Sequence, residues 1–298
     1  MSDLPLIEEK KNLASYSSWL VGGVADYFSQ PETLDQLKSL ILWCEKKNMP
    51  QSILGGGTNV LISDKGIRGL TICMRKLRQL EVVAEQPRLK LEALAGTPKA
   101  QLLKVFLKYK LEPAIFLAGL PGDVGGGVAM NAGVGEALQP REFVEIVDWV
   151  EVLRDQKVIR LAKNELQWSY RHCRGWEPGV IFRVGFSWPN EPKDQIIEVV
   201  KRANKERLHK QPLDLPSCGS VFVNPEGHKS GALIAACGLK GFRVGAAQVS
   251  EKHANFIVNL GHARASDIHQ LIQHVQSTLL SKKQIQLRTE VVYLGDWS

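Results

Sequence analysis

A glycine-rich stretch, AGLPGDVGGGVAMNAG at residues 118–133, constrains the fold of this chain more than any other feature. Glycine adopts positive φ readily and lacks the Cβ atom that keeps a ligand away from the backbone. Consecutive glycines therefore expose successive N–H groups to an anion such as pyrophosphate. A second stretch, LGGGTNVLIS at residues 54–63, has the same character. A single run of this kind is more often a tight turn between buried strands, but two in one chain favour a phosphate-binding site.

Neither glycine run fits the two best-known nucleotide-binding patterns. The sequence has no G-x-x-x-x-G-K-[ST]. It also has no G-x-G-x-x-G that enters a helix with an acidic residue about 20 positions further on. A P-loop kinase and a Rossmann dehydrogenase are therefore both disfavoured.

The composition is that of a folded protein outside membranes. With 298 residues, 44% hydrophobic and 23% charged, the chain is long enough for two or three domains with buried cores. The opening residues MSDLPLIEEKKN contain no apolar segment after a basic one. No run approaches the roughly 18 apolar residues of a membrane span. We therefore expect a cytoplasmic protein with no membrane partner.

Cysteine usage and net charge narrow the class further. The five cysteines are odd in number, widely spread and without a C-x-x-C pair, so we interpret them as reduced thiols and expect no metal site. They are Cys44, Cys73, Cys173, Cys218 and Cys237. The net charge of +7 suits an anionic ligand, and the run KRANKERLHK at residues 201–210 contributes much of it. Such a run is more often the solvated face of a helix than a phosphate contact, and we expect no nucleic-acid partner.

Helical and strand-like segments follow one another without a fixed repeat, which is typical of a mixed α+β chain. The three clearest helices are residues 31–48 opened by Pro31, residues 99–110 with Thr97 as N-cap and Pro98 as first residue, and residues 267–283 with Ser266 as N-cap. The predicted strands are residues 52–54, 59–63, 90–95, 147–153, 157–161, 179–188, 255–260 and 290–295. The strands at 147–153 and 157–161 are predicted to be joined by an Arg-Asp-Gln turn at residues 154–156. Two prolines and charges at residues 189–194, before a long polar helix, predict the main domain boundary.

Seven motifs together resemble the family of UDP-N-acetylenolpyruvoylglucosamine reductases, also called MurB. They run in order from about residue 13 to residue 295. The motifs are WLVGGVADYF (19–28), LGGGTNVLIS (54–63), AGLPGDVGGGVAMNAG (118–133), SYR (169–171), QPLDLPSCGSVFVNPEG (211–227), GLKGFRVGAAQVSEKHANFIVN (238–259) and LRTEVVYLG (287–295). The first three resemble the wider class of flavoproteins that bind FAD between two α+β subdomains, and the last four are peculiar to the reductase. No long insertion follows Ser169-Tyr170-Arg171, which resembles the shorter, type II form.

The resemblance implies a fold and a reaction. The fold is a two-subdomain FAD-binding module of the PCMH/VAO type, residues 1–75 and 76–190, followed by an α+β substrate-binding domain, residues 191–298. In the reaction, hydride passes from NADPH through N5 of FAD to UDP-N-acetylglucosamine enolpyruvate. The product is UDP-N-acetylmuramate for peptidoglycan synthesis. The partners are an anionic UDP-sugar and NADPH, and we expect a monomer.

The resemblance also implies which residues line the FAD. They are Gly22, Gly23, Gly55, Gly56, Gly57, Thr58, Asn59, Gly119, Gly122, Gly125, Gly126, Ala129 and Asn131. Two alternatives stay open. Asn59 and Asn131 could be turn residues whose side chains bond their own backbone. Gly22-Gly23 could be a plain connection between strands.

Three residues match the family's catalytic set. Arg171 would hold the developing carboxylate-enolate through its fixed donors, Glu290 would donate a hydrogen bond to it, and Ser220 would deliver the proton to the α-carbon. Glu290 can donate only if its pKa is raised enough to keep a proton near neutrality. Each residue also has a structural alternative. Arg171 could serve a carboxylate pair, Glu290 could be an edge charge on a strand, and Ser220 could be a turn serine.

Five weaker candidates could contact the substrate: Tyr170, Asn224, Gln248, Lys252 and His253. The last three could equally pack the loop AAQVSEKHA, and a lone histidine is more often structural than catalytic. The chain departs from the family at three positions near the proposed site. They are Leu20, where many relatives carry a basic residue, Cys218 in place of alanine, and Thr289 in place of proline.

Two other functions fit parts of the sequence. Another FAD-dependent oxidoreductase of the same fold would explain the glycine runs, although not Arg171, Ser220 and Glu290 in their reductase contexts. A flavin-binding protein without turnover would fit Leu20 if that position normally touches a phosphate. A nucleic-acid binder would need residues 201–210 as its main surface and a steep loss of affinity with salt.

Overall fold

The computed structural model describes residues 4–134 and 139–298. Residues 1–3 of the first predicted domain and residues 135–138 of the second lie outside the described residues. Contacts within the chain divide it into two compact units. Unit 1 comprises Met1–Ile7, Ser29–Gly56 and Ile72–Glu206, and unit 2 comprises Glu8–Phe28, Gly57–Thr71 and Arg207–Ser298. Both units draw on more than one predicted range, and the three ranges stay a prediction.

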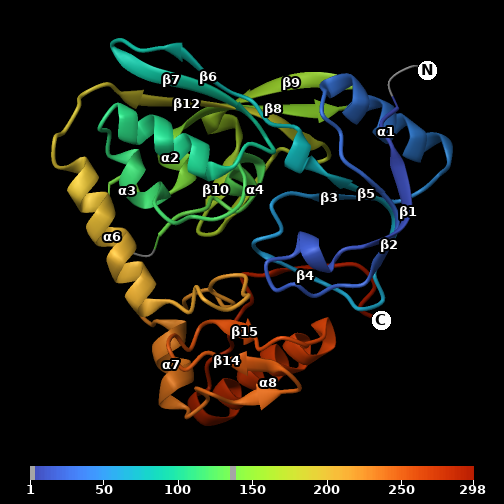
Figure 1. Ribbon diagram of the computed structural model, residues 1–298, viewed down its shortest axis with the longest axis vertical. Helices are drawn as coiled ribbons and strands as arrows, with labels where there is room; N and C mark the ends of the chain where they lie inside the picture. Colours follow the sequence, from blue (N-terminus) through green and yellow to red (C-terminus); the bar gives the residue numbers. More distant parts are fainter. Residues whose placement is uncertain (1–3, 135–138) are drawn as a thin grey trace. The chain divides into compact units, whose positions relative to one another are not determined.

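Unit 1 is built on an antiparallel sheet with the strand order β6-β7-β12-β8-β9. Its strands are β6 (Leu80–Ala84), β7 (Arg88–Leu94), β12 (Val180–Pro189), β8 (Val147–Arg154) and β9 (Lys157–Ala162). Figure 1 shows three helices on the same side of this sheet, α2 (Lys99–Lys108), α3 (Pro113–Leu117) and α4 (Val124–Ala129). The predicted turn between the strands at 147–153 and 157–161 is confirmed, because Asp155 and Gln156 join β8 to β9 with positive φ angles of 48° and 61°.

Aromatic side chains form the centre of the core of unit 1. Phe143 begins α5 (Phe143–Ile146) and packs edge-on against Phe116 of α3 and Phe186 of β12, with ring centroids 6.3 and 6.1 Å away. All three rings are buried, so hydrophobic burial holds α3, α5 and the sheet together. The remaining elements that begin in unit 1 are α1 (Leu34–Lys46), β3 (Gln51–Leu54), η2 (Met74–Lys76), η3 (Lys163–Glu165), β10 (Gln167–Ser169), β11 (His172–Arg174) and α6 (Ile196–Lys210).

Unit 2 contains three small sheets and two helices. The strands β1 (Ile7–Asn12), β2 (Val24–Ser29) and β5 (Ile67–Cys73) pair in that order, and β4 (Val60–Ile62) pairs in parallel with β16 (Val292–Leu294). The third sheet is antiparallel, with β13 (Arg243–Val244), β14 (Ala247–Val249) and β15 (Ile257–Asn259). Helices α7 (Ser230–Ala236) and α8 (Ala265–Lys283) lie beside it in Figure 1, and η1 (Ala14–Tyr16) follows β1.

Trp19 anchors the core of unit 2. Its ring is fully buried among apolar side chains of α8 and the three-stranded sheet. The indole N–H donates to the carbonyl of Ile257 at 2.7 Å, and the side chain of Asn259 donates to the Trp19 carbonyl at 2.8 Å. A buried indole N–H needs such a partner, so these bonds fix the segment before Gly22 against β15.

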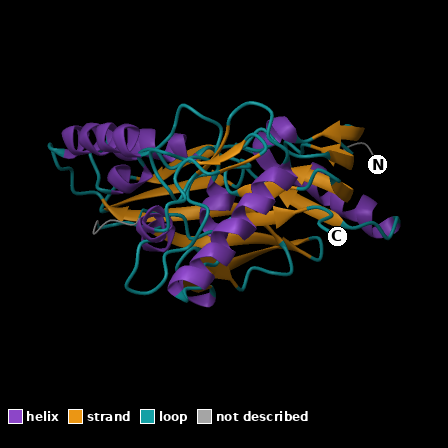
Figure 2. Ribbon diagram, turned by 90° about the horizontal axis from the view of Figure 1, so that it is seen from below, coloured by secondary structure: helices purple, strands orange, loops and turns teal. Residues whose placement is uncertain are grey.

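The helices and strands coloured in Figure 2 confirm the α+β class predicted from the sequence. The long polar helix expected after residues 189–194 is α6, and the basic run at residues 201–210 lies on it, mostly exposed. Within residues 4–134 and 139–298, no helix is long and apolar enough to cross a membrane.

Three predicted helix starts are wrong by one to three residues, and contacts with distant residues account for two of them. Helix α1 begins at Leu34, where the Thr33 hydroxyl accepts the N–H of Gln36, and not at Pro31. Helix α2 begins at Lys99 with Pro98 as N-cap, since the Thr97 hydroxyl bonds the backbone of Gln79 instead. Helix α8 begins at Ala265, one residue before the Ser266 that was predicted to cap it.

Asp64 supplies the side-chain cap of α8 from a distant part of the chain. Its two carboxylate oxygens accept the N–H groups of Ala265 and Ser266, each at 2.9 Å. Burial alone would raise the pKa of Asp64. The bonds from Ser266 and Ala265 and the charge of Arg264 outweigh burial, so the pKa lies below its usual value. The carboxylate also offsets the partial positive charge at this helix end.

We expect Asp64→Ala to lower the free energy of unfolding by about 0.5–2 kcal/mol, the usual cost of losing a helix cap. Because the folded pKa is depressed, the stabilisation is present above the unfolded pKa of about 3.9 and is lost as the pH falls through the folded pKa. Urea unfolding at pH 7 and at pH 3 checks both points. A gap between wild type and variant that stays constant over this range would contradict the cap.

Candidate functional site

The two glycine runs meet within unit 1. A Cβ atom on Gly55 would lie 2.7 Å from Oδ2 of Asp123, and one on Gly56 would lie 2.8 Å from Cα of Gly122. Side chains do not tolerate such distances, so this close approach of two backbones requires glycine. In the second run, Gly119 and Gly122 also have positive φ angles of 76° and 88°.

The second glycine run is partly helical, which differs from the loop expected from the sequence. Asp123 is the N-cap of α4, and its Oδ1 accepts the N–H of Gly126 at 2.9 Å. This cap helps a helix that contains three glycines, which are poor helix formers. The N–H of Gly125 donates to the carbonyl of Ala95. The N–H groups of both glycines are therefore bonded within the protein, so a cofactor contact here would use their Cα atoms or carbonyls.

Asp123 is a buried carboxylate beside the first glycine run, with 4% of its surface exposed. Burial raises its pKa, and the N–H of Gly126 and the positive charge of Lys99 oppose that rise. Within the described residues its Oδ2 atom accepts no hydrogen bond of good geometry, although the backbone N–H of Gly56 also acts to lower the pKa of the carboxyl. A buried polar atom of this kind, next to glycines that no side chain could replace, is typical of a site built around a bound group.

The other end of the first glycine run belongs to unit 2. The carbonyl of Gly57 accepts the N–H of Ser18 at 2.9 Å, and Thr58 follows it. The side chain of Asn59 donates to the carbonyl of Glu290 at 3.0 Å. The side chain of Asn59 therefore links this run to the catalytic candidate Glu290. This bond is not the local turn contact that the sequence left open as an alternative.

Gly22 and Gly23 pack tightly within unit 2. A Cβ on Gly23 would lie 2.2 Å from the carbonyl oxygen of Asp64. The N–H of Gly23 donates to Ser63, and its carbonyl accepts the N–H of Leu13. These contacts support the interpretation of Gly22-Gly23 as a connection between strands. A contact of these glycines with flavin stays a prediction. Leu20, the first departure from the family pattern, is exposed.

Ser220 and Glu290 lie on adjacent chain segments of unit 2. The N–H of Glu290 donates to the carbonyl of Val221 at 2.8 Å, and Phe222 forms a β-bridge with Thr289. Ser220 is half-buried and follows Gly219, whose φ is 75°. Backbone bonds thus hold the proposed proton donor and the proposed enolate partner on neighbouring segments, although 70 positions separate them in the sequence.

Cys218 lies two residues before Ser220 and is buried. Its Sγ is 3.5 Å from the carbonyl oxygen of Val60, and burial raises the pKa of its thiol to about 12. A thiol with so high a pKa is unreactive near neutral pH. All five cysteines are buried and free, which confirms their interpretation as reduced thiols.

Arg171 lies at the turn of a tight hairpin in unit 1. Ser169 at the end of β10 pairs with His172 at the start of β11, which leaves Tyr170 and Arg171 as the loop. Arg171 has φ of 59°, a conformation that costs a non-glycine residue about 1–3 kcal/mol. Its side chain is only 10% exposed, and its guanidinium carbon lies 4.7 Å from the centre of the Tyr170 ring. Tyr170 itself is exposed.

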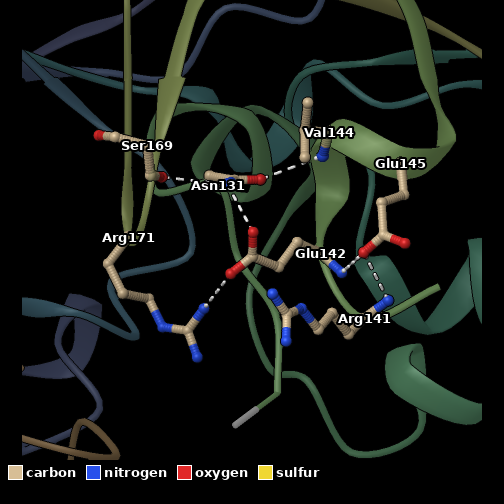
Figure 3. A network of polar contacts seen from close by, with 7 residues as sticks. All are labelled: Asn131, Arg141, Glu142, Val144, Glu145, Ser169 and Arg171. Carbon is tan, nitrogen blue, oxygen red and sulfur yellow. Dashed lines mark hydrogen bonds and ion pairs between the residues drawn. The ribbon is translucent and has the colours of Figure 1, made fainter. Parts of the chain in front are cut away.

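Arg171 belongs to a buried polar network that Figure 3 shows in detail. Its Nη1 lies 3.5 Å from Oε1 of Glu142, and both side chains are largely buried. The side chain of Asn131 donates to Oε2 of Glu142 and to the carbonyl of Ser169, each at 3.1 Å. Its oxygen accepts the N–H of Val144 at 3.0 Å. Both side-chain N–H donors of Asn131 are therefore bonded within the protein. Its contact with a cofactor stays a prediction.

The weaker substrate candidates have internal partners in unit 2. Gln248 is buried and donates to the carbonyl of Gly241, and Asn224 accepts the N–H of Ser230 at the start of α7. Lys252 donates to the carbonyl of Leu208. His253 accepts the N–H of Asn255, and burial lowers its pKa. These contacts favour structural roles for all four, and their substrate contacts stay predictions.

Two residues near the glycine runs and Arg171 were not found from the sequence. Asp123 stands before a helix, as an N-cap does, but the three glycines that follow hid that signal. Glu142 gave no signal, since no motif links a carboxylate to an arginine 29 positions further on.

The fold, with its two adjoining glycine runs, agrees with the class that comparison with known families indicates, the proteins with an FAD binding domain. Residues 25–161 match a family described as an FAD binding domain, and residues 211–294 match the C-terminal domain of UDP-N-acetylenolpyruvoylglucosamine reductase. The chain belongs to the UDP-N-acetylenolpyruvoylglucosamine reductase family. A reductase from Prochlorococcus marinus is 39% identical over 95% of this chain and 92% of its own length. One from Pediococcus pentosaceus is 38% identical over 97% and 94%.

A solved structure agrees with the sequence relatives. The crystal structure of UDP-N-acetylenolpyruvylglucosamine reductase from Thermus caldophilus superposes with a TM-score of 0.82 at 30% identity. The match covers 98% of this chain and 100% of that one. The fold predicted from the sequence is therefore confirmed at the level of the family.

Proposed function

We propose that this protein reduces UDP-N-acetylglucosamine enolpyruvate to UDP-N-acetylmuramate with NADPH, as an FAD-dependent enzyme of peptidoglycan synthesis. Membership of the family supports the reaction. The observation in this chain that carries it is the backbone bond between Glu290 and Val221, which brings the Ser220 and Glu290 segments together. These two segments carry motifs peculiar to the reductase, and another FAD oxidoreductase of the same fold would not explain Ser220 and Glu290 in those motifs.

The residues present fit FAD. Gly55 and Gly56 lie in backbone contact with Gly122 and Asp123, where any side chain would collide. Beside them, Oδ2 of Asp123 is a buried polar atom that accepts no hydrogen bond of good geometry from any residue that the structure describes. When bound there, FAD supplies the hydride relay between NADPH and the UDP-sugar. The protein's part is to hold the reactants and to manage the charge and the proton.

Arg171 would stabilise the charge that develops on the substrate. Hydride addition to the β-carbon pushes negative charge onto the α-carbon and its carboxylate. A guanidinium is suited to this charge, because it is planar, carries five N–H donors and keeps its proton. Its side chain is 10% exposed, so its charge is poorly screened by water and acts more strongly than at the surface.

Ser220 and Glu290 would complete the reduction. Ser220 would give its hydroxyl proton to the α-carbon, and Glu290, in its protonated form, would donate a hydrogen bond to the enolate. Both backbones are held: Asn59 binds the Glu290 carbonyl, and the Glu290 N–H binds Val221 next to Ser220. Such fixed positions suit groups that must meet one carbon atom of the substrate.

An anaerobic absorbance titration tests the function directly. Purified protein should show oxidised flavin bands, NADPH should bleach them, and the enolpyruvyl UDP-sugar should restore them. Bands that bleach but return only with oxygen would identify another FAD oxidoreductase. Bands that do not bleach would identify a flavin-binding protein without turnover, and a carefully reconstituted protein without any flavin would overturn the cofactor assignment.

Several finer points belong to the same proposal. We infer a cytoplasmic monomer whose small-molecule partners are the anionic UDP-sugar and NADPH. The division into residues 1–75, 76–190 and 191–298 and the FAD-lining set named from the sequence are also proposals. Limited proteolysis and sedimentation of the holoenzyme test the domain ranges and the oligomeric state.

A further inference from the structure

Glu142 is the one residue in the Figure 3 network whose carboxylate touches the guanidinium of Arg171 among the contacts drawn there. Its two oxygens contact different groups. Oε1 lies against Nη1 of Arg171, and Oε2 accepts a hydrogen bond from the side chain of Asn131. Asn131 therefore fixes the carboxylate of Glu142, and that carboxylate in turn contacts the guanidinium of Arg171.

Because Arg171 and Glu142 are both largely buried, removal of either charge should disturb the other side chain. The exposed fractions of the two side chains are 10% for Arg171 and 15% for Glu142. A largely buried guanidinium that loses a charged partner loses part of the compensation for its desolvation, which favours a shift of the side chain. Removal of the carboxylate should therefore shift the guanidinium even where the hairpin stays folded.

The hairpin backbone is fixed by the same residue that holds Glu142. Asn131 is 1% exposed, and its side chain binds the carbonyl of Ser169, two residues before Arg171. Asn131 thus sets both the backbone that carries the arginine and the carboxylate that meets its side chain. Two fixed ends leave a long, flexible side chain with few orientations.

We propose that Glu142 is the positioning residue of Arg171, holding Nη1 so that the guanidinium is set to receive the substrate's developing charge. A guanidinium carries five N–H donors in a fixed fork, so a carboxylate at Nη1 does not by itself exhaust them. Glu142 acts through Arg171 and takes no part in hydride or proton transfer. The inference rests on the proposed role of Arg171.

Glu145 provides a matched control in the same loop. Its carboxylate accepts the backbone N–H groups of Arg141 and Glu142 and, as drawn in Figure 3, is directed at the loop backbone. Glu145→Gln and Glu142→Gln make the same chemical change three residues apart. Both variants should bind flavin and bleach with NADPH as wild type does. Flavin reoxidation by the enolpyruvyl UDP-sugar should slow about tenfold in Glu142→Gln only, a loss of the size expected for a misplaced charge partner.

A double-mutant cycle isolates the coupling to Arg171. If Glu142 acts only through the arginine, Glu142→Gln should change the reoxidation rate of the Arg171→Ala protein very little. Added guanidinium should partly restore reoxidation in Arg171→Ala, and the concentration needed should rise when Glu142→Gln is present, because the carboxylate that binds the cation is gone. The double variant removes both buried charges together, so it keeps the test open if Glu142→Gln alone folds poorly.

The outcomes separate the two proposals. If Arg171→Ala slows reoxidation and Glu142→Gln does not, positioning by Glu142 is wrong and the function stands. If Glu142→Gln slows both half-reactions equally, or Glu145→Gln slows reoxidation as much, the effect is structural and the inference fails. If the flavin of Arg171→Ala is reoxidised at the wild-type rate, the proposed role of Arg171 is wrong. The positioning role of Glu142, which depends on it, is then wrong too.

Discussion

Arg171→Ala should slow flavin reoxidation by the enolpyruvyl UDP-sugar by about 10²–10³-fold, the usual loss when a preorganised donor to a developing oxyanion is removed. Bleaching by NADPH should stay close to wild type, because no enolate forms in that step. The two rates separate by anaerobic stopped-flow absorbance of the loaded protein. The split between them is the diagnostic quantity, since a folding defect would lower both.

Arg174→Ala is the control for this experiment. Arg174 ends β11 in the same hairpin, is exposed, and donates to the ring of His172. Its removal changes the charge of the hairpin by the same amount without touching the buried network. Arg171→Lys should recover only part of the lost rate, because an ammonium is a single point donor and lacks the planar fork. Full activity with lysine would contradict a role that depends on the fork.

The sequence identified the parts of the fold that local chemistry determines. The turn at Asp155 and Gln156 and the polar helix after residue 194 follow from the preferences of single residues, and both occur as predicted. The second glycine run was expected to be a loop, but part of it forms α4. Helix caps were less predictable. Thr97 is a residue type that often caps helices, but its hydroxyl donates to the carbonyl of Gln79 instead. The cap of α8 comes from Asp64, 201 positions before Ala265. No local pattern contains such long-range partners.

The candidate site shows the same limit. The resemblance named Ser220, Glu290 and Arg171, but only the structure shows the backbone bond between the first two segments. It also shows that one structural alternative is real, since Arg171 does pair with a carboxylate, Glu142. That pairing and the catalytic role are compatible, because a buried arginine near a reaction needs a counter-charge when the substrate is absent. In the proposed arrangement, the ion pair with Glu142 positions Arg171 for its catalytic role.

Ser220→Ala should slow reoxidation by the enolpyruvyl UDP-sugar by about 10²–10⁴-fold, the range for loss of a positioned general acid. Bleaching by NADPH should change little, because that step needs no proton at the α-carbon. Ser217→Ala is the matched control, as it removes a hydroxyl from the same loop on the other side of Cys218. It should leave both rates near wild type.

A second readout separates proton delivery from binding in the Ser220 experiment. If the hydroxyl delivers the proton, Ser220→Ala should lower the maximal reoxidation rate while the UDP-sugar concentration at half-maximal rate changes little. If the hydroxyl only binds the sugar, that concentration should rise and the maximal rate should stay. Equal slowing of both half-reactions would mean that Ser220 supports the fold of the segment beside Glu290, and the proton donor would then have to be sought among the other groups of unit 2.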